Sequence, residues 1–506
     1  MAERPPSIPA HFQLKAQASG TGALDPRTAL LLWGAGSILL GLTVSFLLVR
    51  GEIRLIVMLL LGVLGLACLS PRRGVYILTL LLPFLYYLRR LVLNFQAFEQ
   101  RDPILIFPAL TAVAMFMGVA IFHGPLIFHY LKRSTLLKVC VVLMGWFLIE
   151  IINPLQGGPL VGIAGAMFFI VPMLWCFFGL LMTRKDLGRI LKIVLAIGLV
   201  TALYGLKQHY FGMTDIEIYE LKSKQFYKTF GGSSTVRVMS TFSSPGDFSQ
   251  YLMVAGFITF AYFWRHKKNL MLALIVGLNL WAMLWVAVRT SFLLLMFSIL
   301  ILLALSGRNA MQIKLRGVGA LLAITIAYGV LYQYDPQEMY TTEFSDNPYV
   351  VHTLSGITHP TEEKSLWMRF RNWGFIVSST ITSDPVGRGL GSTTTAAKRF
   401  TGGQAFEADS YFFELFYGSG ILAPVLFAII ALQTLRSLLK KCLEEPNAFD
   451  YKLCLGLMSG IFLGSVFGQA ARDTISGPLA WLIIGWTVRQ TVEHAPGAAP
   501  DLEAAG

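Results

Sequence analysis

Long apolar segments recur along most of the chain. Stretches such as 30–49, 104–122, 160–182 and 292–305 carry almost no charge. The hydrocarbon core of a bilayer is roughly 30 Å thick, which about 20 apolar residues span as a helix. Helices are required there because lipid offers no hydrogen-bond partners to the backbone. The pattern therefore predicts an all-α integral membrane protein.

We expect about 12–14 transmembrane helices, with a long outer loop that contains interfacial helices. The third predicted span is short, and a re-entrant segment is the alternative there. The candidate spans are 28–49, 53–70, 74–89, 104–123, 136–153, 160–183, 188–209, 248–264, 269–288, 290–306, 316–333, 411–435, 451–468 and 474–490.

Basic residues alternate along the connections between the predicted spans. Every second connection is basic, as cytoplasmic loops are; examples are Arg72-Arg73, Lys132-Arg133, Arg184-Lys185 and positions 265–268. The net charge of +13 therefore indicates topology, and it argues against a nucleic-acid partner. Both termini are expected on the cytoplasmic side of the membrane. Arg50, Arg54, Arg89 and Arg90 are exceptions, because this topology places them outside.

Two outer connections are unusually long, at 210–247 and 334–410, and long ordered loops are commonly functional. The five cysteines lie in spans or on the inner side, so no disulfide is expected. The predicted organisation is a cytoplasmic tail (1–27), an N-terminal transmembrane bundle (28–209), the first periplasmic loop (210–247), central transmembrane helices (248–333), a large periplasmic loop (334–410), C-terminal transmembrane helices (411–492) and a disordered cytoplasmic tail (493–506).

The large loop contains an amphipathic pattern. Leu366, Phe370, Trp373 and Val377 recur at helical spacing, which predicts a helix at the membrane interface with its aromatic face towards lipid or the bundle. Arg369 flanks this face and Arg371 lies nearly opposite it. A Gly-Arg-Gly-Leu-Gly turn at 387–391, which includes Arg388, marks a point where the backbone should pass close to another segment.

Several charged residues fall at the predicted outer boundary. Taken singly, Arg289 could snorkel to lipid headgroups, Arg237 could be a solvated loop charge, and Asp409 could cap the helix that starts near Tyr411. Glu414 lies one turn inside an apolar span, where a carboxylate must be paired or face a cavity. Glu407 and Asp409 share a spacing with some metal-using glycosyltransferases, but no histidine pattern predicts a metal site.

Taken together, these residues favour a specific chemistry. Guanidinium groups bind phosphate in a bidentate manner and can stabilise a departing diphosphate without a metal. A nearby carboxylate can accept the proton of an attacking hydroxyl. The outer boundary therefore has the groups needed for sugar transfer from a polyprenyl diphosphate.

Over residues 190–435 the chain resembles the O-antigen ligase and O-antigen polymerase family of polytopic bacterial membrane glycosyltransferases. The resemblance rests on Arg237 with the Thr-Phe-Ser-Ser-Pro-Gly-Asp-Phe-Ser-Gln-Tyr-Leu segment at 241–252, the Val-Arg-Thr-Ser segment at 288–291, the 369–391 region, and Ala-Asp-Ser-Tyr-Phe-Phe-Glu at 408–414. It implies a fold similar to the C-type glycosyltransferases, an undecaprenyl-diphosphate-linked oligosaccharide donor and no cofactor. It also implies that Arg237 and Arg289 match the diphosphate-binding arginines of the family, with Arg369 or Arg371 as a third. We also expect Arg388 to contribute to diphosphate binding.

One departure from the family pattern favours one of its activities. Ligases carry His-Asn ahead of the aromatic run, whereas this chain has Asp409-Ser410. We therefore expect a polysaccharide polymerase with Asp409 as the general base, and Glu407 or Glu414 as substitutes. A flippase and a chain-length regulator are the expected protein partners.

Two other functions remain open. The first is a ligase that transfers the finished glycan to lipid A core or to a protein. The second is a lipid-linked oligosaccharide flippase or another transporter. Transporters place ionisable groups near the membrane midplane, whereas here they gather at the outer boundary, which favours the enzyme.

Overall fold

The computed structural model describes residues 65, 70–93, 103–223, 237–307, 311–312, 315–319, 322, 325–326, 364–394, 397, 406 and 408–493. Within these residues all regular structure is helical. The N-terminal helices are α3 (Pro71–Leu81), η2 (Leu82–Phe84), α4 (Leu85–Leu93), α5 (Pro103–Arg133), α6 (Thr135–Glu150), η4 (Pro154–Gln156), α7 (Pro159–Gly179), α8 (Arg184–Phe211) and α9 (Asp215–Ser223). The later helices are α10 (Pro245–Arg265), α11 (Leu270–Val286), α12 (Arg289–Leu305), α16 (Lys364–Thr382), α18 (Tyr411–Ser419), α19 (Leu422–Glu444), α20 (Phe449–Phe467) and α21 (Ser476–Glu493).

Five of these helices are long and apolar enough to cross a membrane, which confirms an all-helical protein of membrane type. They are Ile106–Arg133, Pro159–Gly179, Arg184–Phe211, Leu422–Glu444 and Phe449–Phe467. Two shorter apolar helices, Leu270–Val286 and Arg289–Leu305, join them. The predicted spans at 28–49 and 53–70, and most of 316–333 and of the 334–410 loop, lie outside the described residues.

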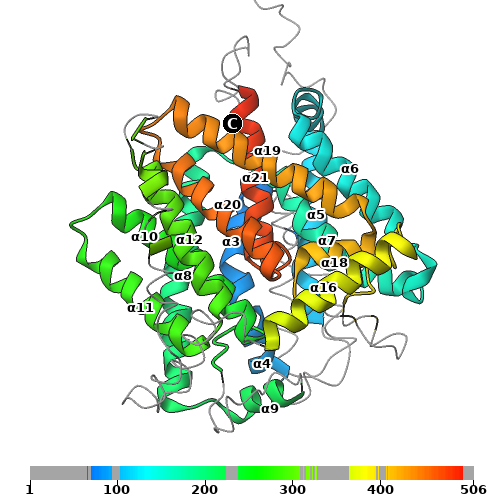
Figure 1. The fold of residues 1–506 in the computed structure, drawn as a ribbon, viewed down its shortest axis with the longest axis horizontal. Coiled ribbons are helices and arrows are strands. Elements are labelled where there is room, and N and C mark those ends of the chain that lie inside the picture. The colour runs from blue at the N-terminus through cyan, green and yellow to red at the C-terminus, as the bar shows by residue number, and fades with distance from the viewer. Residues whose placement is uncertain are drawn as a thin grey trace, which may run out of the picture.

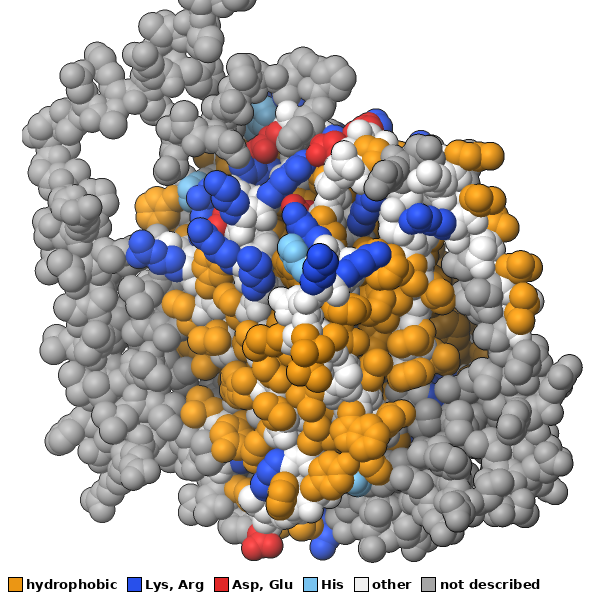
Figure 2. All heavy atoms as spheres, turned by 90° about the vertical axis from the view of Figure 1, so that its left-hand side faces the viewer, with side chains coloured by type: hydrophobic (Ala, Val, Ile, Leu, Met, Phe, Trp, Pro, Cys, Tyr) orange, Lys and Arg blue, Asp and Glu red, His pale blue; other side chains and the backbone are white. Residues whose placement is uncertain are grey.

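The bundle has two chemically different ends. We call the end where α10, α12 and α18 begin the motif end, and the end where α8, α11 and α20 begin the basic end. Figure 2 shows Lys and Arg side chains gathered in a band at one end of the molecule, next to a broad hydrophobic surface. The basic end carries Arg184, Lys185, Arg265, Lys267 and Lys268 at helix ends.

Helix α21 runs through the centre of the bundle (Figure 1), and its residues are almost all buried. It packs against α7 with glycine on both sides: a Cβ at Gly485 would meet the Cys176 carbonyl, and one at Gly179 would meet the Leu482 carbonyl. Small residues let helix backbones approach closely in membranes. The last predicted span is thus the central helix of the described bundle.

Two predicted spans are interrupted. The segment expected as one helix at 411–435 forms α18 and α19, which separate at Gly420 because its φ of +68° is left-handed. The third span changes to a 3₁₀ turn at Leu82–Phe84, where Pro83 cannot donate the helical hydrogen bond. Helix α5 instead extends past its predicted end, and it kinks at His123, two residues before Pro125.

The 387–391 turn explains the break at Gly420. Gly387 has a φ of +102°, and a Cβ there would overlap the backbone of Ser419 and Gly420. Ile421 donates its N–H to the Pro385 carbonyl at 3.1 Å, which holds the two turns together. Gly391 likewise packs against the Val161 backbone. The sequence-based expectation that backbone passes close to another segment at this turn is confirmed.

We predict that Gly387→Ala lowers the melting temperature of the purified protein markedly, because the new methyl group meets backbone and the φ angle disfavours alanine. Gly374→Ala in α16 is the matched control, since nothing lies within 4 Å of a Cβ there. The control should unfold at the same temperature or slightly higher. Equal melting temperatures for the two variants would contradict this packing.

Candidate functional site

Segments far apart in the sequence meet at the motif end. The first turns of α10 and α12 are joined by Ser249 Oγ and Ser291 Oγ, 2.9 Å apart. Tyr411 at the start of α18 donates its N–H to the carbonyl of Gly468 at 2.7 Å. Gly468 begins the α20–α21 connection, and a Cβ built there would lie 3.6 Å from Nε2 of Gln250 in α10. Helix α18 and helix α10 therefore both contact this short connection, and α12 joins them through its bond to α10.

Left-handed backbone occurs at the same segments. Among the described residues, the non-glycine positions with positive φ are Ser240 (+51°), Ala287 (+52°) and Asp409 (+52°). They lie near Arg237, near Arg289 and at the proposed general base, respectively. Backbone in this region is sterically costly and tends to occur at functional sites. The coincidence therefore marks the three segments as one candidate site.

The segment that follows Arg237 is held by hydrogen bonds with the side chain of Gln208 in α8. The Gln208 carboxamide oxygen accepts the N–H groups of Met239 (3.1 Å) and Ser240 (2.7 Å). Its nitrogen donates to the Ser240 carbonyl at 3.2 Å. This side chain stands in for a missing backbone partner, so residues 239–240 are ordered although they form no helix or strand.

Buried arginine also anchors this segment. Arg90 of α4 donates from Nη1 to the Ser240 carbonyl at 2.9 Å and from Nη2 to the Phe242 carbonyl. Its Nε lies 2.6 Å from a carboxylate oxygen of Glu220, and the side chains are 3% and 0% exposed. Arg89 pairs with the same carboxylate at 3.4 Å. The two arginines that the topology placed outside are thus buried partners of α9.

Glu217 completes this network. Its carboxylate accepts hydrogen bonds from Tyr204 at 2.9 Å, Gln208 at 2.7 Å and the Thr214 N–H at 2.8 Å. A buried charge is tolerated only when it is paired and hydrogen-bonded. Helix α9 is therefore tied to α4 and α8 by charged and polar contacts.

Asp409 lies at the surface beside helix α16. Its carboxylate is 60% exposed, with one oxygen 3.7 Å from Arg369 Nε. Trp373 of α16 donates its indole N–H to the Ala408 carbonyl at 2.9 Å and stacks on Phe413 at 4.6 Å. A helix is present where the amphipathic pattern predicted one, and Trp373 on its aromatic face packs against the bundle. The same contacts hold Asp409 in place.

The remaining predicted site residues differ in their surroundings. Arg371 is exposed on α16. Arg388 donates from Nε to Asp384 at 2.7 Å and lies 5.1 Å from the centre of the Tyr417 ring. This hydrogen bond to Asp384 is the main cause that raises the pKa of Arg388. Glu407 lies outside the described residues.

Glu414 is fully buried and paired, as expected for a carboxylate inside an apolar span. Its two oxygens lie 2.6 Å from Arg472 Nη1 and 2.7 Å from Gln469 Nε2. Arg472 also covers the ring of Phe168 at 4.9 Å. These contacts suit an anchor for the α20–α21 connection better than a proton acceptor.

Arg472 and Asp473 were missed in the sequence. Asp473 is buried, and one carboxylate oxygen accepts the N–H and hydroxyl of Ser476, which favours the start of α21. Burial first, and then the Asp247 carboxylate, raises the pKa of Asp473 to about 7. A charged pair in a short outer connection was the available signal.

Comparisons with known proteins do not add to this picture. No protein-family model matches the chain, and no curated protein matches it either. Within the described residues, no group of three or more His, Cys, Asp or Glu side chains is arranged to hold a metal ion.

We predict that Arg90→Met destabilises the protein by roughly 3–5 kcal/mol, because it leaves Glu220 buried without its main partner. Arg189→Met is the control: the Arg189 side chain is 69% exposed, and pairs with a solvated partner contribute roughly 0–1 kcal/mol. Asp186 is largely buried but keeps its hydrogen bonds from Tyr76 and Thr183 in this variant. Denaturant unfolding of both variants in the same detergent measures the difference. Similar losses would show that the buried pair does not hold α4 to α9.

We also predict that Asp473→Asn stabilises the protein more at pH 8 than at pH 5. The pKa of Asp473 when folded, about 7, lies above the value of about 3.9 for an unfolded chain. Between these values the folded state keeps a proton that the unfolded state has lost, so the free energy of unfolding falls as pH rises. Asparagine does not ionise, so the Asp473→Asn variant lacks this pH-dependent decrease in the free energy of unfolding. Melting curves of wild type, the variant and the exposed control Asp215→Asn test it; parallel curves for all three would contradict it.

Proposed function

We propose that this protein is a polysaccharide polymerase, which transfers an undecaprenyl-diphosphate-linked glycan onto a sugar hydroxyl at the periplasmic face of a bacterial inner membrane. The observation that carries the proposal is the meeting, at one end of an apolar bundle, of the segments of Arg237, Arg289 and Asp409, each next to left-handed backbone. The family resemblance gives this arrangement its chemical meaning.

The distribution of charge supports the orientation. Lys and Arg concentrate at the basic end, which under the positive-inside rule faces the cytoplasm. The motif end then faces the periplasm, where lipid-linked repeats are polymerised according to the resemblance. Both chain termini would lie in the cytoplasm.

The proposed donor site uses Arg237 and Arg289. Arg289 is the first residue of α12, and Arg237 precedes the segment that leads into α10. Helix N-termini favour anions through their free N–H groups and dipole. Two guanidinium groups near two helix starts would hold the diphosphate and stabilise the charge that develops when it leaves.

The proposed reaction is a single inverting displacement. The acceptor hydroxyl oxygen forms a bond to the anomeric carbon, and the bond from that carbon to the diphosphate oxygen breaks. The electron pair leaves with undecaprenyl diphosphate, and the hydroxyl proton passes to the Asp409 carboxylate. Asp409 suits this role better than Glu414 because it is exposed, whereas Glu414 is buried against Arg472.

Activity on a synthetic polyprenyl-diphosphate repeat tests the proposal. Purified protein in EDTA should yield a ladder of products at one-repeat intervals. A single shift that requires added lipid A core or protein would support a ligase instead. Translocation in liposomes without covalent change would indicate a flippase and overturn both enzyme hypotheses.

Variants separate the proposed roles. We predict that Arg289→Ala lowers kcat by about 10²–10³, with poor rescue by Arg289→Lys because lysine cannot bind phosphate in a bidentate manner. Asp409→Asn should lower kcat by about 10²–10⁴. Lys268→Ala, an exposed charge change at the basic end, is the control and should stay fully active. Full activity of Asp409→Asn at normal expression would remove Asp409 as the base.

A further inference from the structure

A cationic cleft lies at the basic end, away from the proposed donor site. It has a volume of about 660 Å³ and lies between the first turns of α8, the end of α10 and the start of α20. Its charged lining comprises Lys185, Arg189, Lys192, Arg265, His266 and Asp450. Four permanent positive charges therefore face one carboxylate.

These cations remain available to a ligand. Lys185, Arg189 and Lys192 are exposed and follow one another at positions i, i+4 and i+7, so they share one face of α8. Arg189 lies 3.7 Å from Asp186, but its side chain is 69% exposed. Arg265 lies over the ring of Phe449 at 4.8 Å, which fixes its guanidinium at the rim of the cleft.

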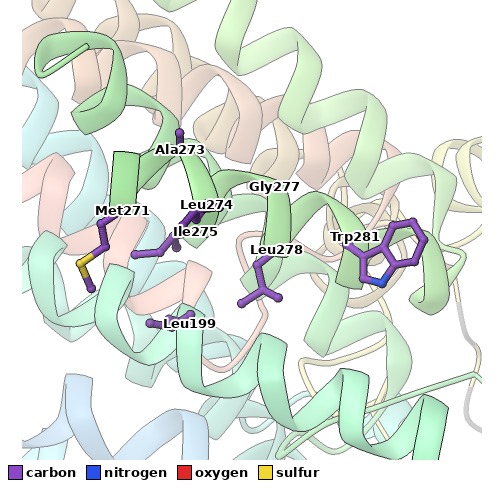
Figure 3. Close-up of a pocket in the computed structure, with 8 residues that line it drawn as sticks. All are labelled: Leu199, Met271, Ala273, Leu274, Ile275, Gly277, Leu278 and Trp281. Carbon is purple, nitrogen blue, oxygen red and sulfur yellow. The ribbon is translucent and has the colours of Figure 1, made fainter. Parts of the chain in front are cut away.

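An apolar groove continues from this cleft along the seam of α8 and α11. The cleft ends at Leu195 and Leu272, and the groove includes Leu199, one turn further along α8, together with Leu274 and Leu278 of α11. Figure 3 shows the α11 side chains from Met271 to Trp281, with Leu199 of α8 opposite them. The groove has a volume of about 580 Å³, and its lining is apolar throughout.

A cationic cleft that adjoins an apolar groove matches the charged headgroup and apolar chains of an anionic lipid. A cationic cleft at a membrane boundary suits a phosphate headgroup, and an adjoining apolar groove suits an acyl chain. A soluble phosphate would use only the cleft, and a zwitterionic lipid would gain little from its excess of positive charge. We propose that the α8–α10–α11 surface binds an anionic phospholipid of the leaflet at the basic end.

The site is separate from the proposed donor site. Both ends of α8 are involved in different contacts: Lys185 lies in the first turn, whereas Gln208 supports the Arg237 segment near the last. With 28 residues and a rise of 1.5 Å each, α8 is about 42 Å long. The lipid site therefore goes beyond the proposed activity and does not depend on it.

Native mass spectrometry of the delipidated protein in neutral detergent tests the proposal. Dioleoyl phosphatidylglycerol should bind at least about 25-fold more tightly than dioleoyl phosphatidylcholine, because this preference includes the contributions of Lys185 and Lys192 at about five-fold each. The variant Lys185→Gln/Lys192→Gln should bind phosphatidylglycerol roughly 25-fold more weakly, since each charge near a lipid headgroup contributes about five-fold. The control Arg436→Gln/Lys440→Gln, which removes two exposed charges from α19, should change it less than two-fold.

A second variant separates a lipid from a free phosphate. A Cβ at Gly277 would meet nothing within 4 Å, so Gly277→Phe can place its ring in the groove, and an unchanged melting temperature will show that the helix is intact. It should weaken phosphatidylglycerol at least five-fold and leave glycerol phosphate binding unchanged. Glycerol phosphate that binds wild type as tightly as the lipid would overturn the lipid assignment. Equal binding of the two lipids by wild type would overturn the proposal without any variant.

Discussion

The buried ion pair between Arg90 and Glu220 is the interaction on which the motif end depends. Neither charge is solvated, so each requires the other, and the remaining donors of Arg90 turn to the carbonyl groups of Ser240 and Phe242. One side chain thereby joins α4, α9 and the segment that leads into α10. Because α10 in turn contacts α12 through Ser249 and Ser291, the pair also bears on the position of Arg289.

A second set of contacts, made by residues of α16 and α18, positions Asp409. Trp373 holds the Ala408 carbonyl and the Phe413 ring, and Tyr411 bonds to Gly468. Gly387 and Gly420 allow the turn before α19 to pack against the turn after α16. The ion pair between Glu414 and Arg472 joins α18 to the α20–α21 connection. The proposed base is thus exposed at its tip but held firmly by its neighbours, which is the arrangement that proton transfer requires.

Much of this could be predicted from sequence because hydropathy and charge are local properties. Apolar length gave the helices, the 366–377 pattern gave α16, and the cost of burying Glu414 predicted that it is paired. What could not be predicted depends on distant partners. Arg89 and Arg90 looked anomalous until Glu217 and Glu220, more than 100 residues away, were seen beside them. The break at Gly420 likewise depends on the turn at Gly387. The raised pKa of Asp473 depends on its burial and then on the distant Asp247 carboxylate. The local hydropathy and charge pattern does not predict contacts between residues this far apart in the sequence.

The central claim is that the motif end is preorganised to bind a diphosphate. Equilibrium binding of a short prenyl diphosphate and the matching prenyl monophosphate to the wild-type protein, both in EDTA, tests it most directly. Two bidentate arginines should favour the diphosphate by at least ten-fold, since a second charge-assisted contact contributes roughly 1.5–3 kcal/mol. Equal affinity for the two ligands, or no binding of either, would contradict the account.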